Sequence, residues 1–356
     1  MVSVTPDALR IDGDRSHRAR RISVILIVVL LATSLFSLGW GAAGTSFWRV
    51  LGDLAAGREL SLQDRVVIFD IRMPRLLMGI LVGAALACSG AVMQGLFRNP
   101  LADPGLVGVS AGASLGAISM IVLAGSLPVA LANFFGWYLV PVAAFVGGWC
   151  SMMVLYRIAT LSGRTSIATM LLAGIVLGAL TGAVSGVLVF KANDNQLREL
   201  TFWGLGSLAG ANWTKVMVAG PIILIALGFS PLLARGLNAL ALGEAAASHT
   251  GIRLQRIKNA AILTVAAATG AAVAVSGGIG FVGIVVPHLL RLATGPDHRW
   301  LLINSALLGA TMLLLADVAS RTIVAPAELP IGIITALIGG PVFLWILLKK
   351  RGVVDL

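Results

Sequence analysis

The chain has 356 residues, of which 58% are apolar and only 12% are charged. Soluble domains carry about 25% charged residues, and disordered chains combine low hydrophobicity with high net charge, so this composition excludes both classes. The net charge of +11 would suit a nucleic-acid partner, but the basic residues lie between long apolar runs, which indicates a membrane protein and no nucleic acid.

Ten stretches of the sequence are apolar over about the 20 residues that a helix needs to cross a membrane. The first follows several arginines and is longer than a signal-peptide core, and no convincing cleavage site follows it, so we expect a retained anchor. The sequence therefore predicts an all-α, polytopic membrane protein in which a basic cytoplasmic tail, 1–21, precedes a single transmembrane domain, 22–350. The predicted helices are residues 22–44, 75–95, 105–124, 138–157, 167–190, 213–234, 258–276, 280–293, 300–319 and 331–348.

The basic residues indicate how these helices are oriented. If the N-terminus is cytoplasmic, ten crossings return the C-terminus to the same side, and most of the 26 Lys and Arg residues then lie on cytoplasmic segments. This bias has the sign that the positive-inside rule requires. We therefore expect both termini in the cytoplasm.

Two stretches of the sequence repeat each other. Residues 83–90 read GAALACSG and residues 270–277 read GAAVAVSG, and at the same offset Pro100 pairs with Pro287. The two stretches fall in the second and seventh predicted crossings, which run in opposite directions, so they suggest an inverted repeat of the kind found in transporters. The alternative is a chance likeness between helices rich in small residues.

The sequence offers no recognisable chemistry of its own. No lysine follows glycine in a G-x-x-x-x-G-K-[ST] phosphate loop, and no catalytic or metal-ligating set emerges. Cys88 and Cys150 lie in apolar runs as small buried hydrophobes, and His288, the only histidine close to a predicted helix, is expected to be structural. The helix centres are nearly free of charge, unlike those of an ion-driven carrier, so a partner is expected to supply the energy for any transport.

Two patterns inside or beside the predicted helices are candidates for a function. In helix 167–190, glycines four residues apart form one stripe beside Thr181 and Ser185, which favours close helix packing over the wall of a pathway. In the loop 235–258, the Ala- and Leu-rich stretch 238–249 predicts a short cytoplasmic helix that ends near Gly251. This helix is either a docking element or an ordered linker.

Three arginines lie at the opposite membrane face. Arg72 and Arg75 flank a Met-Pro pair before the second predicted helix, and Arg321 follows the ninth. We expect them to be exposed, where they reach lipid headgroups or pair with carboxylates of a docking protein.

The sequence resembles the permease subunits of ATP-binding-cassette (ABC) importers for iron-siderophores, haem and cobalamin. Four stretches carry the resemblance: RMPRLLMGILVGAALACSGAVMQGLFRNPLADPGLVGVSAGASLGA at 72–117, ALGEAAASHTGI at 241–252, SGGIGFVGIVVPHLLRL at 276–292 and PAELPIGIITALIGGPVFLWILL at 326–348. It implies a homodimer in a bacterial inner membrane, two cytoplasmic ATPase subunits that bind ATP and Mg, and a periplasmic binding protein. The chain itself then binds no cofactor, and the cargo expected is haem (hemin). Alternatives are a ferric siderophore or cobalamin, or an autonomous secondary carrier.

The resemblance also assigns roles to individual residues. It implies a pathway lined by the fifth and tenth helices, a cytoplasmic gate in two segments, and a coupling helix at about 240–251 that docks into the ATPase. The residues are Arg72, Arg75 and Arg321 for binding-protein docking; Asn99, Leu101, Thr165 and Ser166 for the gate; Leu242, Gly243, Glu244, Ala245, Ala246 and Gly251 for coupling; and Gly178, Thr181, Gly182 and Ser185 for the pathway.

Overall fold

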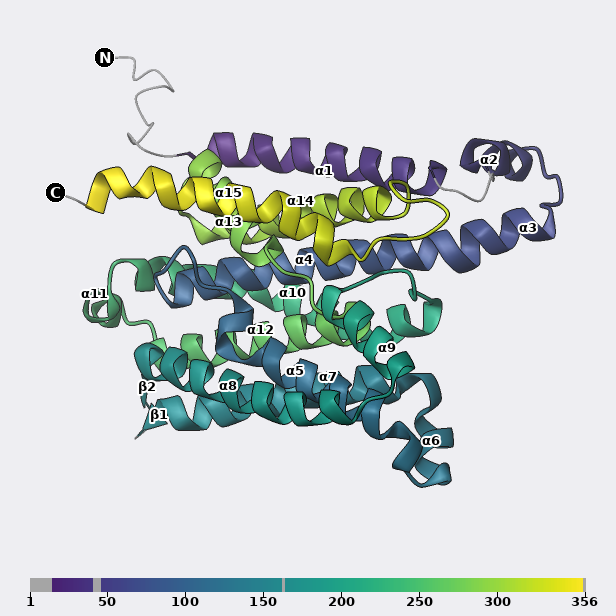
Figure 1. Ribbon diagram of the computed structural model, residues 1–356. Coiled ribbons are helices and arrows are strands. Elements are labelled where there is room, and N and C mark those ends of the chain that lie inside the picture. Colours follow the sequence, from purple (N-terminus) through teal and green to yellow (C-terminus); the bar gives the residue numbers. More distant parts are fainter. Residues whose placement is uncertain (1–14, 41–45, 162–163, 355–356) are drawn as a thin grey trace, which may run out of the picture.

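The computed structural model describes residues 15–40, 46–161 and 164–354, which form a bundle of long helices (Figure 1). Among these residues, eight helices are long and apolar enough to cross a membrane, and two shorter apolar helices bring the set to ten. Each overlaps one predicted span, which confirms the all-α, ten-helix prediction. The eight are α1 (Ser16–Gly39), the continuous α3 (Leu62–Arg65), η2 (Val66–Arg72) and α4 (Met73–Leu96), α5 (Val109–Leu123) together with η4 (Ala124–Ser126), α7 (Leu139–Ala159), α8 (Ile167–Lys191), α10 (Trp213–Ala241), α12 (Leu254–Ser276) and α14 (His298–Ser320). The two shorter apolar stretches are α13 (Val282–Thr294) and the first part of α15 (Ile331–Val354), residues 331–345.

Successive membrane helices run in opposite directions, so the connections alternate between the two ends of the bundle (Figure 1). One end, called the α11 end, holds the start of α1, the end of α15, α11 and a short hairpin. The opposite end, called the α9 end, holds α2, α3, α6 and α9. The connecting elements are α2 (Phe47–Ala55), η3 (Pro104–Val107), η4 (Ala124–Ser126), α6 (Val129–Phe135), η5 (Gly136–Tyr138), β1 (Thr160–Leu161), β2 (Arg164–Thr165), α9 (Asp194–Leu205) and α11 (Glu244–His249).

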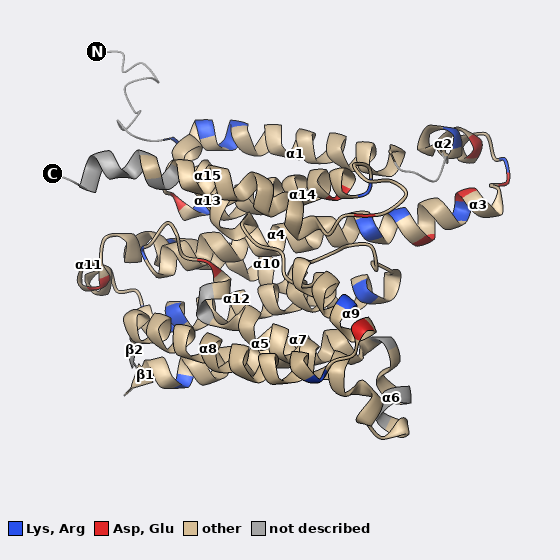
Figure 2. Ribbon diagram, viewed as in Figure 1, with Lys and Arg blue, Asp and Glu red and all other residues tan. Residues whose placement is uncertain are grey.

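Charged residues gather toward the two ends of the bundle (Figure 2). The band between the ends is almost entirely uncharged, as the hydrocarbon core of a membrane requires. The ten crossings and this band together make the chain a multi-pass membrane protein.

The central helix of the bundle is α4, against which α10, α12, α13 and α14 pack. Small residues allow these helices to approach closely. A Cβ atom on Gly90 would lie 1.9 Å from the carbonyl oxygen of Gly283 in α13, and one on Gly83 would lie 2.4 Å from the carbonyl oxygen of Gly309 in α14. Only glycine permits these two crossings.

The repeated stretches lie in α4 and α12, which run in opposite directions through the bundle (Figure 1). GAALACSG lies in the middle of α4, whereas GAAVAVSG spans the end of α12. Pro100 lies in a loop, whereas Pro287 lies inside α13. The two stretches thus lie at different heights in their helices, and the inverted repeat stays a prediction.

Several local predictions need correction. The first helix begins at Ser16, so the arginines at 18, 20 and 21 lie in its first turns rather than in the tail. α10 continues to Ala241, and the short helix in the following loop covers only Glu244–His249. The reason is that residues 238–241 extend the periodicity of α10, and Gly243, at φ 103°, separates the two helices.

The two cysteines, both predicted to be buried, differ in their exposure. Cys88 is buried in α4, but Cys150 is exposed on α7, because an apolar residue of a membrane helix can face lipid as well as the core. His298 is also buried and begins α14, so His288 is not the only histidine at a helix.

Candidate functional site

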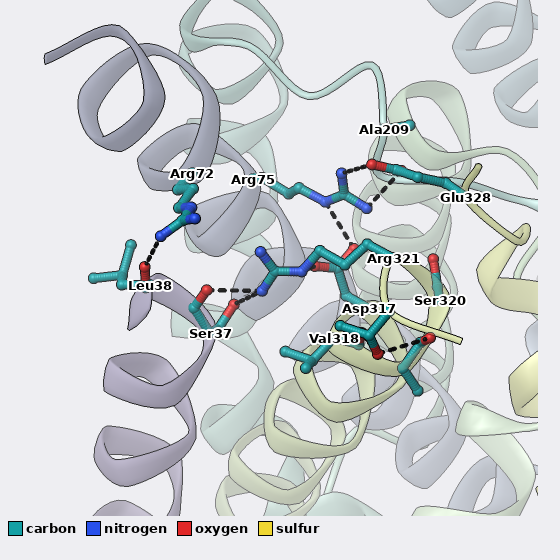
Figure 3. Close-up of polar contacts among 12 residues, drawn as sticks. Ser37, Leu38, Arg72, Arg75, Ala209, Asp317, Val318, Ser320, Arg321 and Glu328 are labelled. Carbon is teal, nitrogen blue, oxygen red and sulfur yellow. Dashed lines mark hydrogen bonds and ion pairs between the residues drawn. The ribbon is translucent and has the colours of Figure 1, made fainter. Parts of the chain in front are cut away.

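Arg75, in the first turn of α4, holds two carboxylates (Figure 3). Its Nε donates to Oδ1 of Asp317 at 2.9 Å, and its Nη1 and Nη2 donate to Oε1 and Oε2 of Glu328 at 2.8 and 2.9 Å. Asp317 lies in the last turn of α14, and Glu328 lies in the loop before α15. Arg75 therefore ties α4 to both sides of the α14–α15 connection through charge-assisted hydrogen bonds.

Two other arginines bind the end of α1 (Figure 3). Nη1 of Arg72 donates to the carbonyl oxygen of Leu38 at 2.6 Å, and Nη2 of Arg321 donates to the carbonyl oxygen and the hydroxyl of Ser37 at 2.7 and 2.9 Å. The last carbonyls of a helix lack partners in their own helix and carry partial negative charge, so they accept these bonds well. Nε of Arg321 also lies 3.5 Å from Oδ2 of Asp317.

The arginine cluster, defined as Arg72, Arg75 and Arg321, is not exposed as predicted. The three residues are only 5%, 7% and 8% exposed. Burial is possible because carboxylates and helix carbonyls of the same chain accept hydrogen bonds from the guanidinium groups. Glu328 differs from its partners, since its side chain is 36% exposed.

The first predicted gate segment is a tight turn between α4 and η3. Oδ1 of Asn99 accepts a hydrogen bond from the N–H of Leu101 at 3.0 Å, and Oδ1 of Asp103 accepts one from the N–H of Gly105 at 2.7 Å. Burial raises the pKa of the Asp103 carboxyl, and the bond from Gly105 opposes that rise. Asn99 is exposed and Leu101 is half-buried, so this turn presents polar and apolar groups at the α11 end.

The second predicted gate segment is the β1–β2 hairpin and the start of α8. The strands pair Thr160 with Thr165, and the Ser166 hydroxyl caps α8 by accepting a hydrogen bond from the N–H of Thr169. Thr165 is buried against α12, where the Gln255 side chain accepts from its N–H at 3.0 Å and donates to its hydroxyl. This segment is therefore held by α12.

The predicted coupling segment, residues 242–251, projects from the α11 end (Figure 1). Gly243 and Gly251 flank α11 with φ angles of 103° and 75°, which glycine adopts at little cost. The side chain of Leu242 is 74% exposed, and Ala245 and Ala246 are exposed beside it. The segment thus offers a small apolar surface to a partner.

The structure places this segment between the two gate segments. A Cβ atom on Gly243 would lie 3.8 Å from Nη1 of Arg98, the residue before Asn99. On the other side, Oε1 of Glu244 accepts a hydrogen bond at 2.8 Å from Nζ of Lys258, whose other acceptor is the carbonyl oxygen of Thr165. Lys258 thus joins the coupling segment to the second gate segment, and Gly243 lies close to the neighbour of the first gate segment.

Three of the four glycines in the α8 stripe have no packing partner within the described chain. Nothing lies within 4 Å of a Cβ atom placed on Gly178, Gly182 or Gly186. The packing interpretation is therefore wrong for these three glycines within one subunit, whereas Gly174, at the start of the stripe, is buried inside the bundle. Thr181, in contrast, is buried, and its hydroxyl donates to the carbonyl oxygens of Leu177 and Gly178, so it offers no free polar group, whereas Ser185 is half-buried.

Two charged residues of these clusters were missed by sequence reasoning. Glu328 lies in the PAELP stretch. A lone acidic residue at the same membrane face as three arginines could have indicated an ion pair within the chain. Lys258 is the first residue of the predicted helix 258–276, but α12 begins one turn earlier, at Leu254, and Lys258 is buried. The cluster around Arg75 lies at one end of α4 and the gate residues follow its other end, so the two form separate sites.

Comparisons with known proteins agree with the resemblance seen in the sequence. The profile described as the FecCD transport family matches residues 27–349. The chain is 45% identical over 326 residues to the hemin transport system permease protein of Yersinia pestis, covering 92% of this chain and 95% of that protein. It is 41% identical over 342 residues to the vitamin B12 import system permease protein of Salmonella typhi, covering 94% and 98%. A solved structure described as a metal-chelate type ABC transporter in an inward-facing conformation matches with a TM-score of 0.81 at 31% identity, covering 93% and 99%.

Proposed function

The chain belongs to the FecCD transport family as an ABC importer permease, and from this premise we propose that its cargo is haem. The observation that supports haem is the 45% identity to a hemin permease over 92% of the chain. The vitamin B12 permease at 41% identity keeps cobalamin as the second candidate. The membership argues against the autonomous carrier suggested by the repeat alone.

The α11 end is the cytoplasmic end in this proposal. The positive-inside bias of the sequence supports this orientation, since the arginines at the start of α1 and those around α11 lie there. Both termini then lie in the cytoplasm of a bacterium, and the α9 end faces the periplasm. Import runs from the α9 end to the α11 end.

A separate ATPase docks on the coupling segment and supplies the work. The exposed side chain of Leu242 and the exposed Ala245 and Ala246 give this docking an apolar contact, and the positive-φ glycines fix the angle at which α11 projects. ATP and Mg bind to that partner. The chain itself acts as the lever that turns ATPase closure into movement of the membrane helices.

A periplasmic binding protein docks over the arginine cluster. Because the three arginines are buried and bonded within the chain, docking needs an acidic side chain of the partner to replace an internal acceptor. Glu328 is the exposed member of the cluster, so its bidentate pair with Arg75 is the contact that a partner carboxylate can exchange with least desolvation.

A second copy of the chain completes the pathway. The open glycine face of α8 supports this part of the proposal, since Gly178 and Gly182 meet nothing in their own subunit. A surface of glycine and aliphatic side chains binds a large, flat cargo weakly, which suits transit. Selectivity then resides mainly in the binding protein.

Transport in reconstituted membranes tests the proposal. The chain is purified in mild detergent, the co-purifying proteins are identified by mass spectrometry, and the complex is placed in liposomes with its binding protein and either hemin, cobalamin or a ferric siderophore. ATP-dependent uptake of hemin above the other two is the expected result. Preferential uptake of cobalamin or the siderophore would show that the cargo is not haem and would leave the family assignment unchanged. Uptake without any ATPase would support an autonomous carrier.

A further inference from the structure

Lys258 is a buried cation that joins two segments assigned to different tasks. It is 5% exposed, and its Nζ donates to Oε1 of Glu244 at 2.8 Å and to the carbonyl oxygen of Thr165 at 3.1 Å. Glu244 begins α11 in the coupling segment, and Thr165 ends the hairpin in the second gate segment. One ammonium group thus bridges the ATPase-docking element and the gate.

Gln255, one turn before Lys258 on α12, strengthens the gate side of this bridge. Its Oε1 accepts from the N–H of Thr165, and its Nε2 donates to the Thr165 hydroxyl and to Oδ1 of Asn259. Every polar group of Thr165, its N–H, its hydroxyl and its carbonyl, is therefore bonded to a side chain of α12. The hairpin cannot move independently of this turn of α12 without breaking these bonds.

The burial of Lys258 makes the bridge stiff. An ammonium group removed from water is costly unless acceptors satisfy it, so Nζ and its two acceptors must move together or separate at a large cost. The side chain of Glu244 is 45% exposed, so this carboxylate is the acceptor that lies nearest to a docking partner. A displacement of α11 therefore acts on Lys258 first and on Thr165 through it.

We propose that Lys258 is the positioning residue that transmits the movement of the ATPase-docked α11 to the gate at Thr165. This inference rests on the proposed function, because it takes α11 as the ATPase contact. The inference adds a defined route to the proposed function, which runs from the Glu244 carboxylate through the Lys258 ammonium group to the Thr165 carbonyl. A merely structural tie predicts a loss of stability and nothing else, whereas a transmitting residue sets how much cargo moves for each ATP hydrolysed.

The test compares Lys258→Met with Arg256→Met, a matched control at an exposed position of the same helix. Each variant is reconstituted with its ATPase and binding protein, and hemin uptake and ATP hydrolysis are measured together. We expect Lys258→Met to keep the ATPase bound and hydrolysing while the cargo moved per ATP falls about tenfold, the size that one charge-assisted hydrogen bond provides. Lys258→Arg, which keeps the charge, is expected to recover most of the loss.

A second readout reports the gate directly. Leu161 is 81% exposed in the hairpin, so Leu161→Cys, in a Cys150→Ser background, can be labelled by a membrane-impermeant thiol reagent. In the otherwise unchanged protein the labelling rate should change when ATP and vanadate are added. With Lys258→Met it should stay constant.

Wild-type cargo per ATP, or ATP-dependent labelling, in Lys258→Met would overturn the inference. If that variant does not fold, Glu244→Gln removes only a half-exposed charge, and an unchanged cargo-to-ATP ratio in this second variant is equally decisive. A wild-type complex that lacks an ATPase contradicts the proposed function instead, so the two failures are distinguishable.

Discussion

Glu328 fills the guanidinium fork of Arg75, with both carboxylate oxygens accepting hydrogen bonds, at 2.8 and 2.9 Å. The third donor of the same guanidinium, Nε, is bound to the buried Asp317. An acidic side chain of the chain itself thus occupies the position expected for a carboxylate of the binding protein. Docking at Arg75 is then an exchange of one carboxylate for another, and its free energy is the difference between the two pairs.

Glu328→Gln is therefore expected to tighten docking of the binding protein. The amide keeps the shape of the side chain and removes the charge that competes for Arg75. Because the carboxylate is partly exposed, its pair is worth at most about 1 kcal/mol, so the gain in affinity should be up to about fivefold. Binding to the permease in lipid nanodiscs measures it, with Glu199→Gln, an exposed position on α9, as the control. Weaker docking of the binding protein would contradict the idea that its carboxylate replaces Glu328 on Arg75.

Asp317→Asn is expected to destabilise the protein strongly. The Asp317 side chain is 1% exposed and compensates both Arg75 and Arg321, so its neutralisation removes the carboxylate that pairs with Arg321 and one of the two carboxylates of Arg75. Breaking a buried pair costs about 3 kcal/mol or more. Thermal unfolding in detergent measures the loss. Asp53→Asn, which breaks only the exposed pair with Arg58, should leave the melting temperature nearly unchanged.

Gly90→Ala is expected to disturb the α4–α13 crossing. Its Cβ would lie 1.9 Å from the carbonyl oxygen of Gly283, and two helix backbones cannot separate locally without losing neighbouring contacts. The expected cost is about 3 kcal/mol. Gly228→Ala, on α10, meets nothing within 4 Å and should be neutral or slightly stabilising. Equal melting temperatures for the two variants would show that the crossing relaxes.

Gly182→Leu is expected to separate transport from stability. The position is open within the subunit, so the larger side chain causes no clash there, and leucine favours a helix by about 0.8 kcal/mol over glycine. The melting temperature should therefore hold while hemin uptake falls, because the side chain narrows the pathway. Size-exclusion chromatography checks that the dimer persists, and Gly228→Leu serves as the control. Unchanged hemin uptake would show that Gly182 on α8 does not line the pathway.

The membrane architecture could be predicted because it depends on properties that are additive along the chain. Apolar length decides whether a segment crosses the hydrocarbon core, and all ten predicted spans are helices. The helix boundaries could not be predicted from apolar length alone, since the end of α10 and the start of α11 depend on Gly243 and on the contacts of the loop. The tight turn at 98–105 came from the structure, in which the side chains of Asn99 and Asp103 accept hydrogen bonds from backbone N–H groups two residues ahead.

The sequence by itself determined the class of protein, the ten crossings and the family, since these follow from hydrophobic length and from long contiguous motifs. Only the tertiary structure decided which charges meet. It buried the arginines that were expected to be exposed, placed Glu328 on Arg75 across more than half of the chain, and joined Glu244 to Thr165 through Lys258. The physical reason is that a buried charge requires a partner, and helix packing rather than sequence separation determines which partner is within reach.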